Sequence, residues 1–319
     1  MNKTCGTAAV VGAGPCGVAA AVQLNRSGIR TLLFERDGVG GLLWNANLVE
    51  NYPGFPRGIP GPALCRLMER HLHTAGIEPL FDEVSGILPE QGGYTLRTGT
   101  GRTFHAGAVI LATGTRPDTG MVQGEERLVG LRIFYEVKDV LERDSVSRVA
   151  ILGGSDAAYD YALNLVSRGC RVKILQRGPA RCLPLLAARA KEHGLVEVLE
   201  SIRVTGCREM TGGLELFLTG SGTFSRLEAD VLLIACGRSP EQGLIESLQA
   251  FPSKEWGDKI FGTSLPEGLF RGGDLVRGPF RQAGIAVGDG LAAAMSAAKY
   301  LRTCATNGAP SRGGCTEWS

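Results

Sequence analysis

The sequence lacks an excess of charge of either sign. Its 34 lysine and arginine residues nearly balance 32 aspartate and glutamate residues, which leaves a net charge of +2 at pH 7. It also lacks an apolar run long enough to span a bilayer. Nucleic acids and membranes are therefore not expected as partners, because each requires a strongly basic surface or a long apolar segment.

Paired cysteine motifs are also missing. The nine cysteines are scattered, and no two of them stand in C-x-x-C spacing. This pattern predicts neither a disulfide framework nor a metal site, and it favours reduced thiols in a cytoplasmic protein. Glycine, by contrast, is plentiful: 46 of 319 residues, in a composition that is 44% hydrophobic and 21% charged. Such a composition is typical of an α/β protein with many tight turns, and the length suggests about two domains.

The strongest motif lies near the N-terminus. An apolar run ends where Gly12, Gly14 and Gly17 stand in G-x-G-x-x-G spacing before a helical pattern. A second predicted strand, Ile29 to Phe34, ends on the acidic Glu35. This order predicts a βαβ dinucleotide-binding unit, in which Gly14 lets the backbone approach a pyrophosphate and Glu35 binds the ribose. The helix N-terminus adds unpaired N–H groups and a partial positive charge.

A long loop and a mixed α/β segment follow. The stretch from Gly40 to Phe55 is rich in Gly, Asn and Pro, and so long a loop inside a compact domain is usually functional. We predict a helix from Pro62 to Thr74, then an antiparallel meander and a buried strand. The predicted strands are Val84 to Leu88, Tyr94 to Thr98, Thr103 to His105 and Ala108 to Ala112.

The same order of elements then occurs a second time. A strand leads through the turn Gly153-Gly154-Ser155 into a helix, a strand, a meander and another buried strand. We interpret this as duplication of a nucleotide-binding domain, with the second copy inserted in the first. The strands predicted here are Val149 to Leu152, Arg171 to Leu175, Leu214 to Leu218, Thr223 to Leu227 and Val231 to Cys236.

The predicted fold class is therefore α/β, with two nested Rossmann-like three-layer domains that each carry a β-meander. Residues 1–117 and 246–319 are expected to form the first domain, and residues 118–245 the second. Near the C-terminus the small-residue run from Gly284 to Tyr300 predicts a helix, and residues 303–319 a mobile tail.

Taken together, these motifs resemble the low-molecular-weight thioredoxin reductases. These are two-domain FAD and NADPH flavoproteins of the pyridine nucleotide–disulfide oxidoreductase group, and the likeness covers about Thr7 to Leu301. The residues that carry it are the Gly12, Gly14 and Gly17 turn, Val49 to Gly54, Ala112-Thr113-Gly114, Thr263-Ser264, Gly273-Asp274 and Arg281-Gln282-Ala283.

The resemblance implies FAD in the first domain, with Asp274 on the ribityl chain. It places Asn51 and the Arg281-Gln282 backbone near the flavin ring, and it implies a homodimer. The full set of FAD-binding residues expected is Gly12, Gly14, Pro15, Cys16, Gly17, Glu35, Arg36, Gly41, Leu42, Asn51, Ala112, Thr113, Gly114, Gly273, Asp274, Arg281, Gln282 and Ala283.

The chain departs from that family where the family's redox chemistry lies. Thioredoxin reductases carry C-x-x-C just before the second glycine turn, but here Leu131 to Leu152 contains no cysteine. A dithiol relay needs two thiols, so a conventional thioredoxin reductase is not expected. The stretch from Tyr135 to Asp139 resembles instead the related ferredoxin–NADP reductases, which share the fold and lack the pair.

The second glycine turn is altered as well. Ser155 stands where a glycine usually lets the pyrophosphate approach, so its side chain would crowd the phosphates, although its hydroxyl could bond one. In the resembled family, basic residues after the second strand bind the 2′-phosphate of NADPH, and Arg177 and Arg181 fit that spacing. NADPH is therefore favoured over NADH, while two solvated arginines remain the alternative. The residues expected to bind the nicotinamide cofactor are Gly153, Gly154, Ser155, Asp156, Ala157, Arg177 and Arg181.

Three hypotheses for the function remain open. The first is an NAD(P)H-dependent flavin reductase that passes electrons to ferredoxin, flavodoxin or a small molecule. The second is a disulfide reductase that uses Cys16, which resembles the cysteine of bacillithiol disulfide reductase-like flavoproteins and whose pKa the helix N-terminus would lower. In the alternative, Cys16 only packs the turn, and Cys304 and Cys315 are either a substitute dithiol or chance surface cysteines. The third is a flavin-binding subunit or sensor without a nicotinamide step, or a flavoprotein fed by another donor.

Overall fold

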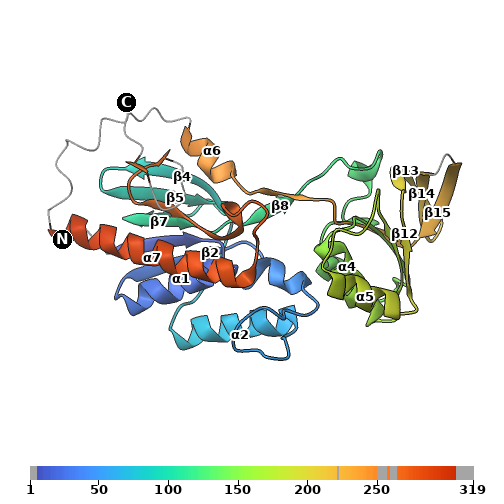
Figure 1. Ribbon diagram of the computed structural model, residues 1–319. Coiled ribbons are helices and arrows are strands. Elements are labelled where there is room, and N and C mark those ends of the chain that lie inside the picture. The colour runs from blue at the N-terminus through green and yellow to red at the C-terminus, as the bar shows by residue number, and fades with distance from the viewer. Residues whose placement is uncertain (1–5, 221–222, 250–256, 259–263, 307–319) are drawn as a thin grey trace.

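The protein was analysed as a computed structural model that describes residues 6–220, 223–249, 257–258 and 264–306. Figure 1 shows two α/β units side by side, one at each end of the molecule. Each unit is built on a five-stranded sheet in which neighbouring strands run parallel. The first sheet has the order β20 (Leu269–Arg271), β7 (Ala108–Leu111), β1 (Thr7–Val11), β2 (Arg30–Glu35) and β3 (Leu80–Phe81).

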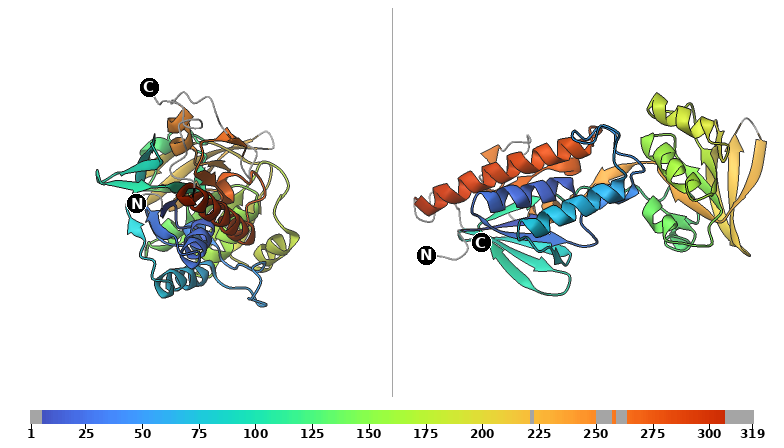
Figure 2. Two further views of the ribbon diagram at one scale, coloured as in Figure 1. Left: turned by 90° about the vertical axis from the view of Figure 1, so that its left-hand side faces the viewer. Right: turned by 90° about the horizontal axis from the view of Figure 1, so that it is seen from below.

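The central strand of the first sheet is covered on both faces. All five residues of β1 are buried, as a parallel sheet between two layers requires. Helices lie along one face, as Figure 2 shows, while a meander covers the other. The helices are α1 (Pro15–Arg26), α2 (Gly61–Thr74) and α7 (Ala283–Thr306), and the meander strands are β4 (Val84–Glu90), β5 (Gly93–Thr98) and β6 (Thr103–Ala106).

The second unit repeats this plan. Its sheet has the order β12 (Val196–Leu199), β11 (Arg171–Leu175), β10 (Arg148–Leu152), β16 (Val231–Ile234) and β9 (Ile133–Phe134). One face packs on α3 (Val137–Leu141), α4 (Asp156–Val166) and α5 (Pro184–Glu192). The other face packs on β13 (Arg203–Met210), β14 (Gly213–Gly220) and β15 (Thr223–Ala229).

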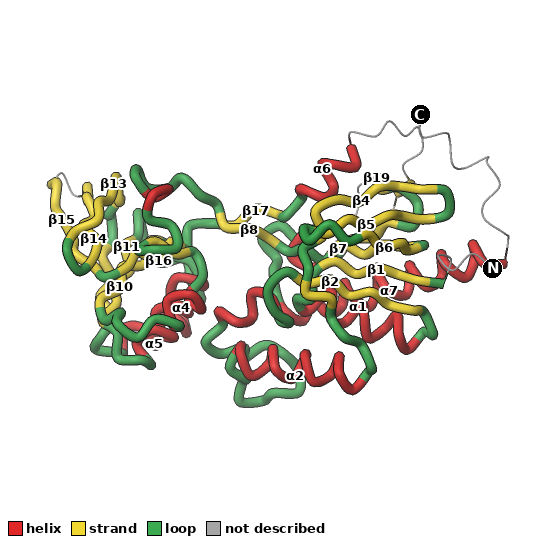
Figure 3. The backbone as a smooth tube through the Cα atoms, turned by 180° about the vertical axis from the view of Figure 1, so that it is seen from behind, coloured by secondary structure: helices red, strands yellow, loops and turns green. Residues whose placement is uncertain are grey.

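Two antiparallel strands connect the units. β8 (Thr115–Pro117) pairs with β17 (Arg238–Pro240), and Figure 3 shows this ribbon between the two sheets. After it, α6 (Gly243–Gln249) returns to the first unit, where Ile245 packs in the core beside the meander. The predicted domain boundary at residue 246 falls within this helix.

The predicted fold class is confirmed, because two Rossmann-like α/β units with meanders are present. The predicted tail is wrong at its start, since α7 continues to Thr306 and includes Cys304. Thr263 and Cys315 lie outside the described residues. Periodicity also missed the short elements: the 3-10 helices η1 (Gly41–Asn45), η2 (Glu125–Arg127) and η3 (Gly273–Leu275), and the two-residue strands β18 (Gly257–Asp258) and β19 (Ser264–Leu265). Within the described part of the chain, no helix is long and apolar enough to cross a membrane.

Candidate functional site

The first glycine turn is shaped by three glycines with different tasks. Gly12 has a positive φ of 98°, and a Cβ there would lie 2.4 Å from the carbonyl oxygen of Ala112. A Cβ on Gly17 would lie 1.7 Å from the carbonyl oxygen of Gly12. Both glycines are therefore required by the packing of α1 against the strands. Gly14 differs, because its φ of −68° suits any residue and a Cβ would meet nothing within 4 Å.

The packing of the protein does not require glycine at position 14, but the open space there would suit a bound ligand. The residue is the N-cap of α1, where backbone N–H groups and the helix dipole favour an anion. The loop after β2 folds back on the turn, because Gly40 donates from its N–H to the carbonyl of Ala13 at 2.8 Å. A Cβ on Gly41 would lie 3.3 Å from Gly14 Cα, so the loop borders the same space.

Glu35 is fixed beside this turn at the end of β2. Its Oε2 accepts a hydrogen bond from the Ala13 N–H at 2.6 Å, and its Oε1 accepts from the N–H groups of Arg36 and Asp37 at 2.9 Å. The carboxylate is only 9% exposed. These bonds hold it at the position from which the acidic residue of a dinucleotide fold contacts a ribose.

The remaining predicted FAD residues converge on the same edge of the first sheet. The parallel strands β1, β2, β7 and β20 all end there, so the residues that follow them lie together. Asn51 Nδ2 donates to Gln282 Oε1 at 2.9 Å, which joins the long loop to the start of α7. The residues brought to this edge are Gly12, Gly14, Pro15, Cys16, Gly17, Glu35, Arg36, Gly41, Leu42, Ala112, Thr113, Gly114, Gly273 and Asp274. Their role in FAD binding stays a prediction.

Asp274 stands in η3 in a largely buried position. Burial raises the pKa of its carboxyl group and the nearby carboxylate of Asp289 acts in the same direction, whereas the positive charges of Arg281 and Arg238 lower it. Asp289 is 3% exposed and accepts the Gly273 N–H at 3.0 Å. Arg277 hydrogen-bonds to both oxygens of Asp289, its Nε at 2.8 Å and its Nη2 more closely.

Asp289 and Arg277 are the supporting residues that the sequence reasoning missed. Together they fix the backbone of η3 and hence the position of Asp274. The available signal was an aspartate within the small-residue run of α7, because a buried carboxylate in a helix interior requires partners.

Cys16 is a packing residue in this structure. Its side chain is 4% exposed, and a Cβ on Gly273 would lie 2.9 Å from Cys16 Cβ. Burial raises the pKa of the Cys16 thiol to about 12, and the carboxylates of Asp289 and Asp274 act in the same direction. This direction is opposite to the one expected from the position of Cys16 at a helix N-terminus, because burial disfavours the charged thiolate.

The second glycine turn repeats the backbone of the first. Gly153 has a positive φ of 147°, and a Cβ there would lie 2.5 Å from the carbonyl oxygen of Ala235. Ser155 is the N-cap of α4 with φ −97° and ψ 176°, close to the −68° and −177° of Gly14. Its side chain makes no capping hydrogen bond. The serine Cβ and hydroxyl therefore stand where the first turn leaves open space.

The loop after β11 closes over this turn. Arg181 donates from its N–H to the carbonyl of Gly154 at 2.8 Å, and Leu183 donates from its N–H to Asp156 Oδ1 at 2.7 Å. Burial raises the pKa of Cys236, while the charges of Arg177 and Arg181 act in the opposite direction. Because Cys236 follows β16, both guanidinium groups lie near the carboxyl edge of the second sheet. They are exposed, and no ion pair of either is found among the described residues.

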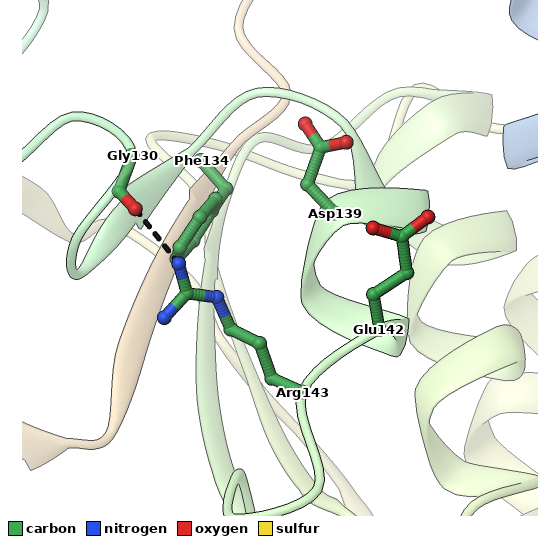
Figure 4. Close-up of a pocket in the computed structure, with 5 residues that line it drawn as sticks. All are labelled: Gly130, Phe134, Asp139, Glu142 and Arg143. Carbon is green, nitrogen blue, oxygen red and sulfur yellow. Dashed lines mark hydrogen bonds between the residues drawn. The ribbon is translucent and has the colours of Figure 1, made fainter.

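The segment from Leu131 to Leu152 includes β9, α3 and the whole of β10 and contains no cysteine. An open hollow of about 420 Å³ lies here, lined by Gly130, Phe134, Asp139, Glu142 and Arg143. Figure 4 shows that Arg143 closes one side of it. Its guanidinium lies 4.5 Å from the centre of the Phe134 ring and donates to the Gly130 carbonyl at 2.7 Å. No redox-active side chain lines this hollow.

Comparisons with known proteins agree with this geometry. A family model described as pyridine nucleotide-disulphide oxidoreductase matches residues 6–290. The thioredoxin reductase of Mycolicibacterium smegmatis is 30% identical over 309 residues, which cover 92% of this chain and 95% of that protein. A bifunctional thioredoxin reductase/thioredoxin of Mycobacterium leprae is 30% identical, but the chain spans 65% of its length. The crystal structure of Lactococcus lactis thioredoxin reductase in its FR conformation is 27% identical, with a TM-score of 0.82 over 93% of this chain and 99% of that one.

The contrast between Gly14 and Gly17 gives a direct test of the first turn. Gly14→Ser should fold as the parent does, because its backbone is ordinary and space is open, yet lose FAD affinity by about 10- to 100-fold, as overpacking a tight contact costs about 1–3 kcal/mol. Gly17→Ala should instead lower the free energy of unfolding by more than about 3 kcal/mol, because its Cβ meets the Gly12 carbonyl. Denaturant unfolding measures the free energy of unfolding of each variant, and FAD titration of the apoprotein measures its FAD affinity. Unchanged FAD affinity in Gly14→Ser would contradict the assignment.

Proposed function

The chain belongs to the pyridine nucleotide–disulphide oxidoreductase family, and on that basis we propose that it passes electrons between NADPH and an acceptor other than a dithiol of its own. The thioredoxin reductases of this family use FAD and NADPH. The observation that carries the proposal is the absence of cysteine from Leu131 to Leu152, together with the absence of C-x-x-C anywhere in the sequence. A relay through a protein disulfide requires two neighbouring thiols.

The residues of the first unit fit FAD. The open space at Gly14 would take the pyrophosphate against the N-terminus of α1, and Glu35 would hold the adenine-side ribose. Asp274, held by η3, would bind the ribityl chain, and the Asn51–Gln282 pair would lie beside the flavin ring. FAD bound there would supply the hydride-accepting and electron-releasing chemistry, which no side chain of this protein provides.

The residues of the second unit fit a phosphorylated nicotinamide nucleotide. Arg177 and Arg181 lie near the carboxyl edge of the sheet, where charge-assisted hydrogen bonds to a 2′-phosphate would favour NADPH over NADH. Ser155 acts against binding through its side-chain volume, which occupies the space that Gly14 leaves open in the first unit. We therefore expect weak binding of the nucleotide with a clear preference for NADPH.

Electrons would leave to ferredoxin, flavodoxin or a small molecule. Direct transfer from the flavin needs no thiol, and the likeness of Tyr135 to Asp139 to ferredoxin–NADP reductases supports such an acceptor. The second candidate, a disulfide reductase that uses Cys16, has less support, because burial disfavours the thiolate that such chemistry requires. A sensor without a nicotinamide step would show no reduction by either nucleotide.

We also propose a homodimer. The exposed face of α7 carries apolar side chains that a second copy would cover. They are Ile285, Leu291 and Met295, which are 37%, 39% and 63% exposed. Sedimentation equilibrium of the FAD-loaded protein should give twice the monomer mass of 33.7 kDa, and Met295→Glu should shift it toward monomer. A monomeric parent protein at micromolar concentration would contradict this proposal.

Anaerobic mixing with NADPH or NADH tests the nicotinamide site. NADPH should reduce the flavin faster than NADH, and Ser155→Gly should increase the rate at low nucleotide concentration. Arg177→Ala should weaken NADPH binding by about 10- to 100-fold, since hydrogen bonds to charged groups are worth about 1.5–3 kcal/mol. Its effect on NADH should be small. If neither nucleotide reduces the flavin, even in Ser155→Gly, the reductase hypothesis fails and another electron donor is required.

Cys16→Ser separates the two enzymatic hypotheses. If the thiol only packs the turn, the variant should retain FAD, reduction by NADPH and turnover with an artificial one-electron acceptor such as ferricyanide. Stopped-flow absorbance of the flavin and steady-state turnover measure these quantities. Retained flavin reduction with loss of a disulfide reductase activity present in the parent would favour the thiol mechanism instead.

A further inference from the structure

Glu136, the N-cap residue of α3, joins three parts of the molecule. Its Oε2 accepts a hydrogen bond from Asn45 Nδ2 at 2.6 Å, and its Oε1 accepts from Arg238 Nη1 at 2.6 Å. Burial raises the pKa of the nearby Tyr161, and the Glu136 carboxylate acts in the same direction. The side chains of Glu136 and Arg238 are only 16% and 20% exposed, so both charges depend on these partners.

The partners of Glu136 belong to different units. Asn45 ends η1 in the first unit, and its Oδ1 accepts the Lys138 N–H at 3.1 Å, so its amide caps α3 across the junction. Arg238 lies on the connecting ribbon, where its Nε donates to Thr115 Oγ1 and its Nη2 to the Thr115 carbonyl, both at 2.9 Å. Glu136 therefore ties the second unit to the first unit and to the ribbon at once.

Helix α4 contacts the same loop. Asp160 Oδ2 accepts the Asn47 N–H at 2.8 Å, and Asn164 Nδ2 donates to the Asn45 carbonyl at 2.7 Å. Asp160 and Asn164 are one helical turn apart, so they present one face of α4 to the loop. Helix α4 begins at the second glycine turn. The contacts of Asp160 and Asn164 with Asn47 and Asn45 therefore set the distance between that turn and the loop.

The loop leads directly to the predicted flavin contact. Arg189 of α5 forms a bidentate ion pair with Glu50 at 2.6 and 2.9 Å, and Asn51 follows in sequence. Both nucleotide-binding turns are therefore connected through one short segment, residues 45–51. The TM-score of 0.82 over 93% of this chain, which includes both units, indicates that the Lactococcus lactis reductase has a similar mutual placement of the units.

We propose that Glu136 is a positioning residue that holds the second unit against residues 45–51, so that hydride transfer occurs in one fixed arrangement of the two units. The part of this proposal that concerns hydride transfer rests on the proposed function. The segment that contains Glu136 is the one in which dithiol enzymes of the resembled type carry their thiols. Here the segment is tied to the junction by a carboxylate whose two oxygens are both occupied.

Glu136→Gln is the central test, with Glu142→Gln as the matched control on the same helix. The first change removes the charge that pairs with Arg238, and its amide group cannot accept both donors. The control removes an equal charge from an exposed position that has no hydrogen bond across the junction among the described residues. Both variants should retain FAD, because neither touches the first glycine turn.

Hydrogen exchange of the FAD-loaded full chain reports on the junction without any activity. In Glu136→Gln, peptides that cover residues 45–50 and 136–141 should exchange at least about tenfold faster, because their cross-unit bonds open locally. Peptides from β1 and β10 should not change. Stopped-flow mixing with NADPH should show a maximal rate of flavin reduction at least about tenfold lower, with the NADPH dissociation constant within about threefold of the parent value.

Asn45→Ala provides a second variant should Glu136→Gln fold poorly. It removes one partner of Glu136 from the other unit, and it should accelerate exchange in residues 136–141 by the same order. In a double-mutant cycle the two changes should be strongly non-additive, since they break one interaction.

Exchange and reduction rates in Glu136→Gln equal to those of Glu142→Gln would overturn the proposal. A parent protein that NADPH does not reduce would refute the proposed function, yet the exchange measurements would still decide whether Glu136 fixes the junction. Faster exchange with an unchanged maximal reduction rate would show that Glu136 has only a structural role, which also overturns the proposal.

Discussion

Two close contacts between a glycine turn and a neighbouring strand determine the architecture of both units. At Gly12 and at Gly153 the carbonyl oxygen of an alanine, Ala112 or Ala235, lies where a Cβ would otherwise be. The contact brings the end of the central strand against the end of its neighbour, and the following helix begins at this edge of the sheet. Because parallel strands end at one edge, every later segment that returns to the sheet delivers its loop to the same place. The candidate sites therefore follow from where the two turns can form.

Much of this was predictable because the signals are local. The glycine spacing, the apolar strands and the acid at Glu35 lie within a few tens of residues, and the structure confirms the turn, the helix and the strand that they predict. Side chains whose properties depend on residues far away in sequence gave no such local signal. Cys16 lies in a helix-start pattern that favours a thiolate, but burial raises the pKa of its thiol and Asp289 and Asp274 act in the same direction, and only the fold produces that burial and brings the two carboxylates close.

The junction between the units was the least predictable part of the molecule. Asn45 stood in a segment expected to be loop, and Glu136 in a segment described mainly by its lack of cysteine. Their hydrogen bond spans 91 positions in sequence, and neither residue was among the expected site residues. No periodicity or propensity rule relates two polar residues in different domains, because the interaction depends on how complete folded units dock.

The serine in the second turn shows that the requirement of the fold and the requirement of a bound ligand can differ at one position. Gly14 and Ser155 share nearly the same backbone conformation, and that conformation is one which any residue adopts without strain. The fold therefore does not decide between glycine and serine at this position; only the ligand does. A first turn that leaves room for a pyrophosphate suits a cofactor that stays bound, whereas a second turn with a side chain in that space suits one that is held weakly and released. With the two units tied together through residues 45–51, the weak nucleotide binding that we propose would not require domain movement, since the side chain of Ser155 would itself occupy the space of the pyrophosphate.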